Sequence, residues 1–210
     1  MSDNPYGEVP ALPAALVFGV LVLAVQLVLL LRSGRPTWPR LTVAAAVAVY
    51  AAGILANTVF PMFLDPLPTS ESWTPALALV PFHDYEVADA LENVAVFVPL
   101  GVLIPLLVRR PSWWRVLLVG AGVSLTIELL QLAAQRFFSG GHVADVNDFT
   151  WNTVGGITGY ALFALVSRVP GSSRVVDRFR RHPTEQAAEP AVSPATPTPP
   201  RGRPTAAPPR

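Results

Sequence analysis

Carboxylate, amide and imidazole side chains cluster around the stretch HVADVNDFTWN, which leads into an apolar run. Such groups can accept hydrogen bonds, transfer protons or hold a hard divalent cation through oxygen ligands. An aspartate at such a border also caps a helix, because its side chain accepts hydrogen bonds from free amide groups. The candidate polar residues, here and in two earlier apolar runs, are Asn93, Glu128, Gln131, His142, Asp145, Asp148 and Asn152.

The elements that carry these side chains are long apolar runs. The chain has 210 residues, of which 51% are hydrophobic and 14% are charged, and this composition is typical of a membrane protein. A helix of about 20 apolar residues crosses roughly 30 Å of hydrocarbon. We therefore expect an all-α integral membrane protein, a bundle of about five transmembrane helices, with apolar runs at residues 12–31, 41–60, 91–108, 114–133 and 148–166.

The arginines sort the loops to two sides of the membrane. All 15 basic residues are arginine, and only Arg136 falls in a segment assigned to the outside. Because cytoplasmic loops carry the excess of basic residues, we expect the amino terminus outside and the carboxyl terminus in the cytoplasm. The use of arginine without lysine suggests a GC-rich bacterial genome, and for a multi-pass protein of that origin we expect the bacterial cytoplasmic membrane as the location.

The same composition excludes several kinds of site. A net charge of +1 argues against nucleic acid as a partner, since phosphate binding needs a concentrated basic surface. The lack of cysteine excludes disulfides and thiolate metal sites. No phosphate-binding loop, zinc motif or nucleophile elbow is present, so no cofactor is expected, and the sequence leaves a metal site undetermined.

Helical spacing places the polar residues on stripes near the outer surface of the membrane. Glu128 and Gln131 share one face of the fourth run, with Glu128 about five residues before the helix end. Asp145, Asp148 and Asn152 share one face of the fifth, with Asp148 as the N-cap. The fifth run continues this face with Gly155 and Gly159, a G-x-x-x-G pattern that lets another helix approach closely. Within the third run, Pro99 and Gly101 should kink and shape the helix.

A carboxylate within a membrane span needs a partner. Insertion scales assign it a cost of about 2.5 to 3.5 kcal/mol, so Glu128 should be paired, protonated or facing water. Arg136 and His142 are the candidate partners. Two interpretations stay open for the polar cluster: a binding or functional site, or hydrogen-bonded contacts that only hold the helices together.

Four motifs resemble the VanZ-like family of small bacterial membrane proteins. They are LVPF (residues 79–82), ENVAVFVPLGVLIPLL (92–107), SLTIELLQL (124–132) and DVNDFTWNTVGGITGY (145–160). The resemblance implies a membrane protein of a family whose founding member is associated with resistance to the glycopeptide teicoplanin. It implies the polar set Asn93, Glu128, Gln131, Asp145, Asp148 and Asn152. The family pattern usually has an arginine three residues before the first aspartate, where this chain has His142.

The apolar runs, the motifs and the composition together divide the chain into three parts. Residues 1–60 hold two amino-terminal transmembrane helices. Residues 61–168 form a VanZ-like core with an extracytoplasmic loop and three transmembrane helices. Residues 169–210, rich in Pro, Ala and Arg, are expected to be a disordered cytoplasmic tail.

Three functions compete for the polar cluster. The leading hypothesis is a cell-envelope protein, with membrane lipids as partners, that binds a glycopeptide or a lipid-linked cell-wall precursor at the outer leaflet and confers low-level resistance to teicoplanin-type glycopeptides. The alternative is an intramembrane enzyme acting on a lipid-linked substrate, with Glu128, Asp145 and Asp148 as acid/base groups or metal ligands. A transporter is a third hypothesis, which the confinement of polar residues to the outer half disfavours.

Overall fold

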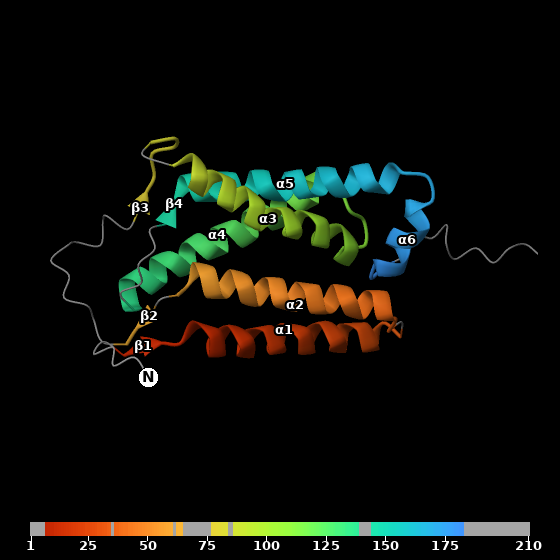
Figure 1. Ribbon diagram of the computed structural model, residues 1–210, viewed down its shortest axis with the longest axis horizontal. Helices are drawn as coiled ribbons and strands as arrows, with labels where there is room; N and C mark the ends of the chain where they lie inside the picture. The colour runs from red at the N-terminus through yellow and green to blue at the C-terminus, as the bar shows by residue number, and fades with distance from the viewer. Residues whose placement is uncertain are drawn as a thin grey trace, which may run out of the picture.

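A computed structural model describes residues 7–34, 36–60, 62–64, 77–83, 86–138 and 144–182. These residues form a bundle of long helices with short strand pairs at one end (Figure 1). In chain order the elements are β1 (Glu8–Val9), α1 (Ala11–Arg32), α2 (Trp38–Thr58), β2 (Met62–Phe63), β3 (Leu77–Ala78), α3 (Val87–Leu107), α4 (Trp113–Phe138), β4 (Ala144–Asp145), α5 (Val146–Arg168) and α6 (Ser172–Phe179).

The prediction of a helical membrane protein is confirmed. Within the described residues, four helices, α1 to α4, are long and apolar enough to cross a membrane by length and composition. Helix α5 is as long, with 23 residues against 22 in α1, but its first turns carry Asn147, Asp148 and Asn152. The argument that α5 is a fifth membrane span therefore has to come from its packing, because its hydropathy does not identify it as one.

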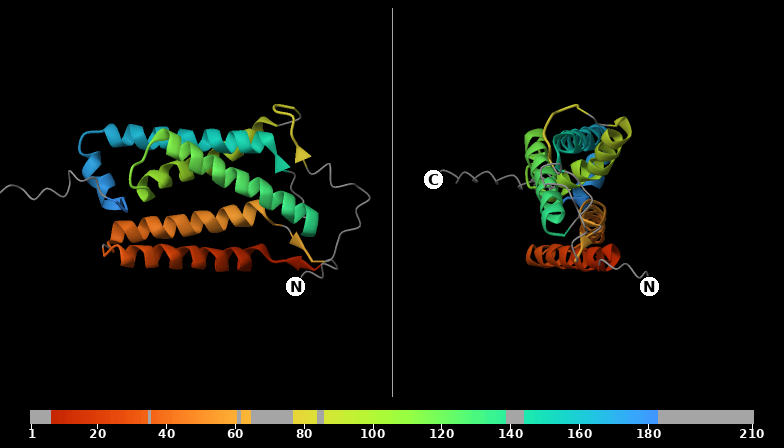
Figure 2. Two further views of the ribbon diagram at one scale, coloured as in Figure 1. Left: turned by 180° about the vertical axis from the view of Figure 1, so that it is seen from behind. Right: turned by 90° about the vertical axis from the view of Figure 1, so that its left-hand side faces the viewer.

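The helices form two groups (Figure 2). Helices α1 and α2 pack on each other as a hairpin, while α3 packs extensively along α5 and α4 also contacts α5. Strand β1 pairs antiparallel with β2, and strand β3 pairs parallel with β4, with Ala78 opposite Asp145. The second pair brings the loop before α3 next to the start of α5.

Glycines make the close contact between α3 and α5 possible. A side-chain Cβ at Gly101 would collide with the carbonyl oxygen of Gly156, and one at Gly159 would collide with the carbonyl oxygen of Val98. At Gly155 the obstacle would be the backbone of Val94. The backbones of the two helices thus approach within a distance that only glycine permits, as small residues allow in membrane helix pairs. We call this contact the glycine seam. Helix α3 runs through Pro99 and Pro105 as one helix.

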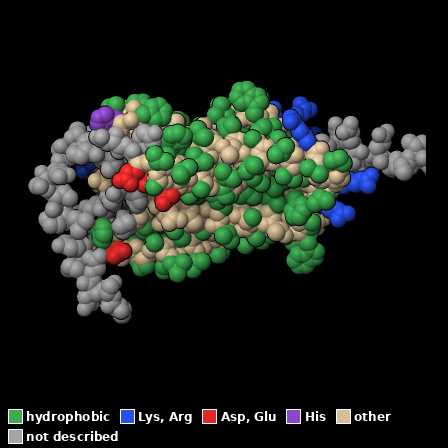
Figure 3. Space-filling view, turned by 45° about the horizontal axis from the view of Figure 1, so that its top comes forward, with side chains coloured by type: hydrophobic (Ala, Val, Ile, Leu, Met, Phe, Trp, Pro, Cys, Tyr) green, Lys and Arg blue, Asp and Glu red, His purple; other side chains and the backbone are tan. Residues whose placement is uncertain are grey.

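Hydrophobic side chains cover the flank of the bundle (Figure 3). In the same view, most visible arginine side chains gather at the end where α6 lies, and the visible acidic side chains lie near the opposite end. A lipid-facing band with the charges at its two ends is the surface that a membrane helix bundle needs, because charged groups are costly within the hydrocarbon.

The arginine end is fixed by hydrogen bonds to the segment after α6. Arg40 of α2 is buried, and its Nε donates to the carbonyl oxygen of Arg180 at 2.9 Å. The backbone amide of Arg181 donates to the carbonyl oxygen of Leu106, the second-last residue position of α3, at 2.8 Å. Helix α6 therefore lies against the bundle, in contact with α2 and α5.

Part of the predicted disordered tail is folded, so the prediction is wrong for residues 172–179. Gly171 takes a positive φ of 85°, which glycine adopts without strain, and starts α6 there. Val176 and Phe179 then share a half-buried face at a spacing of three residues. Residues 183–210 lie outside the described residues, and for them the disordered tail stays a prediction, as do the domain boundaries.

Helix α4 is longer than the sequence predicted. It continues to Phe138, past the expected end at residue 133, because no glycine or proline follows until Gly140. Glu128 consequently lies ten residues before the end of α4 rather than five, which is roughly 15 Å along the helix at 1.5 Å per residue.

Candidate functional site

The start of α5 is built by its N-cap residue, Asp145. Its side chain accepts a hydrogen bond from the backbone amide of Asn147 at 2.7 Å. The sequence prediction gave this role to Asp148 and is corrected here, because α5 begins at Val146 and Asp148 already lies in the first helical turn. Asp148 is therefore free to use its carboxylate elsewhere, although its charge still favours the amino-terminal end of the helix dipole.

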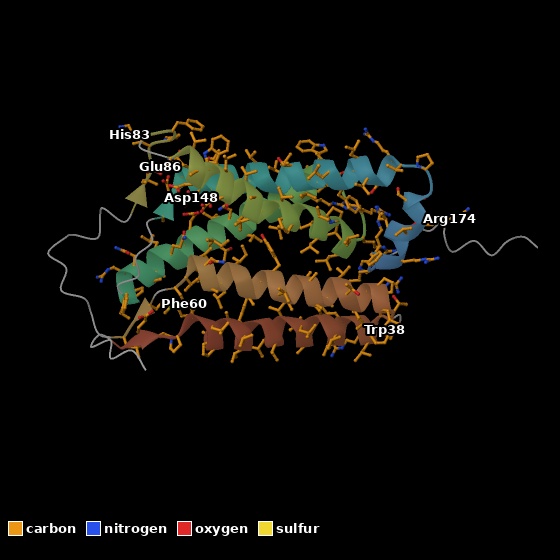
Figure 4. The ribbon with its side chains drawn as sticks, in the orientation of Figure 1. Trp38, Phe60, His83, Glu86, Asp148 and Arg174 are labelled. Carbon is orange, nitrogen blue, oxygen red and sulfur yellow. The ribbon has the colours of Figure 1, made fainter. Side chains whose placement is uncertain are left out.

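Asp148 is joined to α3. Its Oδ1 accepts a hydrogen bond from Nδ2 of Asn93 at 2.7 Å. Figure 4 shows Asp148 near the strand end of the bundle, with Trp38 and Arg174 at the opposite end. The structure thus brings together two predicted polar residues, Asn93 and Asp148, which lie 55 positions apart in the chain.

Glu128 of α4 is also bound to the start of α5. It is 8% exposed, and its Oε2 accepts a hydrogen bond from the backbone amide of Asp145 at 2.9 Å. Its second oxygen, Oε1, is buried without a described hydrogen-bond donor. Arg136, one of its expected partners, is exposed, with its guanidinium 5.8 Å from the ring centre of Phe137. The other expected partner, His142, lies outside the described residues.

Two further predicted residues, Gln131 and Asn152, are deeply buried between the helices. Asn152, 4% exposed, donates from Nδ2 to Oγ of Ser124 at 3.1 Å, which joins α5 to α4. Gln131, 6% exposed, keeps a buried Oε1 without a described donor. An unpaired buried acceptor is unfavourable by roughly 1–3 kcal/mol, so Gln131 holds unused hydrogen-bonding capacity.

The LVPF segment completes the start of α5. The backbone amide of Phe82 donates to Oδ1 of Asn147 at 2.7 Å, and the Phe82 ring meets the Trp151 ring edge-on with centres 6.4 Å apart. Phe82 takes a positive φ of 59°, which is rare for a bulky residue. Asn147 is 2% exposed and holds this loop in place, a role that the sequence analysis missed.

A cavity of about 820 Å³ is lined by four of these side chains. We call it the acidic chamber, since it lies between α2, α3, α4 and α5 and holds four carboxylates. It is lined by Ile54, Asn57, Thr58, Asp89, Glu92, Asn93, Ala95, Val96, Gln131, Asp145 and Asp148. Of the predicted residues, Asn93, Gln131, Asp145 and Asp148 line it, while Glu128 and Asn152 do not.

Sequence reasoning missed the contributions of Asp89, Glu92, Asn57 and Thr58 to the chamber. A signal existed for the first two, because Asp89, Glu92 and Asn93 follow one another at helical spacing and share a face of α3. For Asn57 and Thr58, at the end of an apolar run, no local pattern distinguishes a chamber wall from an ordinary helix end.

Two apolar cavities adjoin the acidic chamber. The first, the α2–α4 groove, has a volume of about 450 Å³, includes Val47, Tyr50 and Ile127, and shares Ile54 and Thr58 with the chamber. The second, the α4–α5 pocket, has a volume of about 330 Å³, contains Glu128, and shares Asp145 with the chamber. Polar and apolar cavities thus lie side by side and share wall residues, which is an arrangement that suits an amphiphilic ligand.

The carboxylates do not form a metal centre in the described part of the chain. No group of three or more His, Cys, Asp or Glu side chains there could hold a metal ion together. What the arrangement offers instead is negative charge, buried acceptors and apolar walls side by side. It can bind a group that donates hydrogen bonds or carries positive charge.

The comparisons with known proteins agree with the motifs. A family model described as VanZ/LLP1 matches residues 18–167, which include α1 to α5 except the first turns of α1 and the end of α5. No curated protein and no solved structure matches the chain. Since the matched region covers more than half of the 210 residues and contains all the residues of the acidic chamber, the chain belongs to the VanZ/LLP1 family.

Proposed function

We propose that this protein spans the bacterial cytoplasmic membrane five times, with its amino terminus outside and the acidic chamber at the outer leaflet. Two observations support the fifth span. Helix α5 lies along α3 through the glycine seam, and its carboxyl end reaches the arginine end of the bundle (Figure 1). The arginines then lie in the cytoplasm, as the excess of basic residues in inner loops requires.

The absence of cysteine allows a direct test of this topology. Val87 at the start of α3 and Val175 in α6 are exposed valines at opposite ends of the bundle, with 67% and 54% exposed. With five spans, a membrane-impermeant maleimide applied to intact cells labels Val87→Cys, and labels Val175→Cys only after lysis. Labelling of both in intact cells, or of Val175→Cys alone, would contradict the topology.

Within this topology, the protein acts on an envelope compound at the outer leaflet and confers low-level resistance to teicoplanin-type glycopeptides. The observation that carries this proposal is the convergence of carboxylates and amides from several helices on one chamber next to apolar cavities. Such a site suits a compound with a polar part and a fatty chain, and teicoplanin-type glycopeptides have both. Membrane lipids and lipid-linked cell-wall precursors are the other candidate partners.

The test is susceptibility to teicoplanin and vancomycin in a sensitive bacterium. The wild-type protein should protect against teicoplanin more than against vancomycin, and the double variant Glu128→Gln, Asp148→Asn should lose that protection at equal expression. The matched control is Asp177→Asn, which removes a carboxylate at the other end of the bundle. Equal shifts for both drugs, or full protection by the double variant, would overturn the proposal.

An enzyme acting on a lipid-linked envelope substrate is the second candidate. It is favoured by Glu128, whose buried Oε1 has no described donor and which lies in the α4–α5 pocket beside Asp145. A carboxylate with a free oxygen can accept a proton from a substrate hydroxyl. Turnover of an envelope lipid by the purified protein, abolished in Glu128→Gln while the variant stays folded, would establish this function. Equal turnover by the variant would remove Glu128 from it.

A further inference from the structure

We infer that the acidic chamber and the α2–α4 groove together bind a single-chain amphiphile whose head group carries a primary amine. This inference names the ligand class of the proposed outer-leaflet site, and rests on the proposed function only for the side of the membrane on which the site opens. The occupant has two chemically different parts, and each cavity fixes one of them.

The chamber selects a cation through its charge. Its lining includes the carboxylates of Asp89, Glu92, Asp145 and Asp148, and no arginine is among its described lining residues. Opposite charges attract and like charges repel, and four carboxylates around one cavity give it a negative potential. An ammonium head group is therefore attracted into the chamber, whereas a phosphate or carboxylate head group is repelled.

The chamber also contains a buried acceptor that no described residue satisfies. Gln131 is 6% exposed, lines the chamber, and has an Oε1 without a described donor. An acceptor left unpaired in a buried position is costly, and a ligand that donates a hydrogen bond removes that cost. An ammonium group carries three donors, so it can satisfy more than one acceptor of such a site.

The groove accommodates a chain because of its position and shape. It shares Ile54 and Thr58 with the chamber, and its lining residues on and just after α2 run from Val47 to Val59. Twelve helical residues correspond to about 18 Å at 1.5 Å per residue, so the groove is long. Its walls are almost wholly apolar, so an acyl chain from the bilayer can pack there without burying a polar group.

The groove can be filled without disturbing the fold. Gly122 of α4 lines it, and a Cβ added there would meet no atom within 4 Å. Gly53 of α2 is equally open but is not a lining residue of the groove. Gly122→Leu therefore obstructs the chain site, and Gly53→Leu is its matched control.

The test uses the full-length protein in phosphatidylcholine nanodiscs and two probes that differ only in the head group. One is a hexadecylamine with a photoreactive diazirine in the chain, and the other is the hexadecanoic acid with the diazirine at the same carbon. After illumination, mass spectrometry of peptides locates the labelled residues. The amine should label groove residues of α2 and α4 saturably, and roughly tenfold more than the acid, as expected from one charge-assisted hydrogen bond gained and a repulsion avoided.

The variants separate the two parts of the site. Glu92→Gln and Asp148→Asn should each lower the labelling by the amine roughly fivefold to tenfold, the loss expected from one ionic contact. Gly122→Leu should abolish groove labelling, while Gly53→Leu and Asp177→Asn should label like the wild type. Equal labelling by the amine and the acid, labelling confined to the α4–α5 pocket or to α1, or unchanged labelling in Gly122→Leu would overturn the inference.

The outcomes are distinct from those of the susceptibility test. Amine-selective groove labelling without teicoplanin protection would disprove the proposed resistance function and leave the ligand class standing. Teicoplanin protection that depends on Asp148, together with equal labelling by both probes, would support the function and disprove the ligand class.

Discussion

Among the described residues, one buried charged side chain lies toward each end of the bundle, and the two have different hydrogen-bond partners. Arg40 and Glu128 are both 8% exposed. Arg40 is bound to the backbone after α6, through Nε to the carbonyl oxygen of Arg180. Glu128 uses one oxygen to bind the start of α5 and keeps the other without a described donor. Equal burial therefore has two different consequences. At the arginine end the buried side chain binds the backbone after α6. At the acidic end the buried side chain has an oxygen without a described donor, which a ligand can use.

The glycine seam connects the two ends, and breaking it should have the largest effect. In Gly159→Ala, the new Cβ collides with the carbonyl oxygen of Val98, so α3 and α5 must separate. We expect a loss of about 3 kcal/mol or more in the free energy of unfolding, since overpacking against backbone cannot relax easily. Unfolding of the purified protein by denaturing detergent measures it.

The control for the seam is Gly156→Ala on the same helix, where a Cβ would meet no atom within 4 Å. This variant should be as stable as the wild type or slightly more stable, because alanine favours a helix by up to about 1 kcal/mol over glycine. A similar loss of stability in both variants would show that α3 and α5 do not approach as closely as described.

At the arginine end we expect an effect on stability alone. Arg40→Met removes the hydrogen bond to the carbonyl of Arg180 and leaves that partly buried acceptor with one donor fewer. The expected loss is about 1.5 to 3 kcal/mol in the free energy of unfolding, the range for hydrogen bonds to charged groups. Protease cleavage after α6 should become faster. Arg32→Met, at an exposed site on α1, is the control, and an equal loss there would contradict the role of Arg40.

A smaller effect is expected for the hydrogen bond between Asn152 and Ser124, which joins α5 to α4 below the acidic end. A double-mutant cycle of Asn152→Ala and Ser124→Ala should give a coupling energy of about 1 kcal/mol, as for one neutral hydrogen bond. Denaturing-detergent unfolding of the four proteins measures it. A coupling near zero would mean that the two side chains contribute independently.

The difference between the two ends was only partly predictable from sequence. The arginine sorting and the apolar runs follow from composition and length, and the polar stripes of α4 and α5 follow from helical spacing. The role of Arg40 could not be predicted from the sequence, because its partner, Arg180, lies 140 positions away in a segment predicted as disordered. The N-cap was misplaced from Asp145 to Asp148 because both aspartates suit a cap, and only the backbone path decides between them.

The acidic chamber shows the same limit. Asn93, Gln131, Asp145 and Asp148 were found because they interrupt or border apolar runs. Asn57 and Thr58 belong to the chamber only because α2 packs beside α3 and α4, and this is a tertiary fact without a local signature. The oxygens of Glu128 and Gln131 that have no donor among the described residues likewise depend on which donors the fold brings near.

The most direct test of the difference between the two ends is to replace each buried charged side chain by glutamine and to measure both stability and teicoplanin protection. Glu128→Gln and Arg40→Gln are compared with the wild type for free energy of unfolding and for teicoplanin protection at equal expression. Glutamine at position 128 can still accept the bond from Asp145, so we expect a stability change of at most about 1 kcal/mol, with protection lost. Arg40→Gln should lose stability and retain protection. The reverse pattern, with protection lost in Arg40→Gln and kept in Glu128→Gln, would contradict a ligand site at the acidic end.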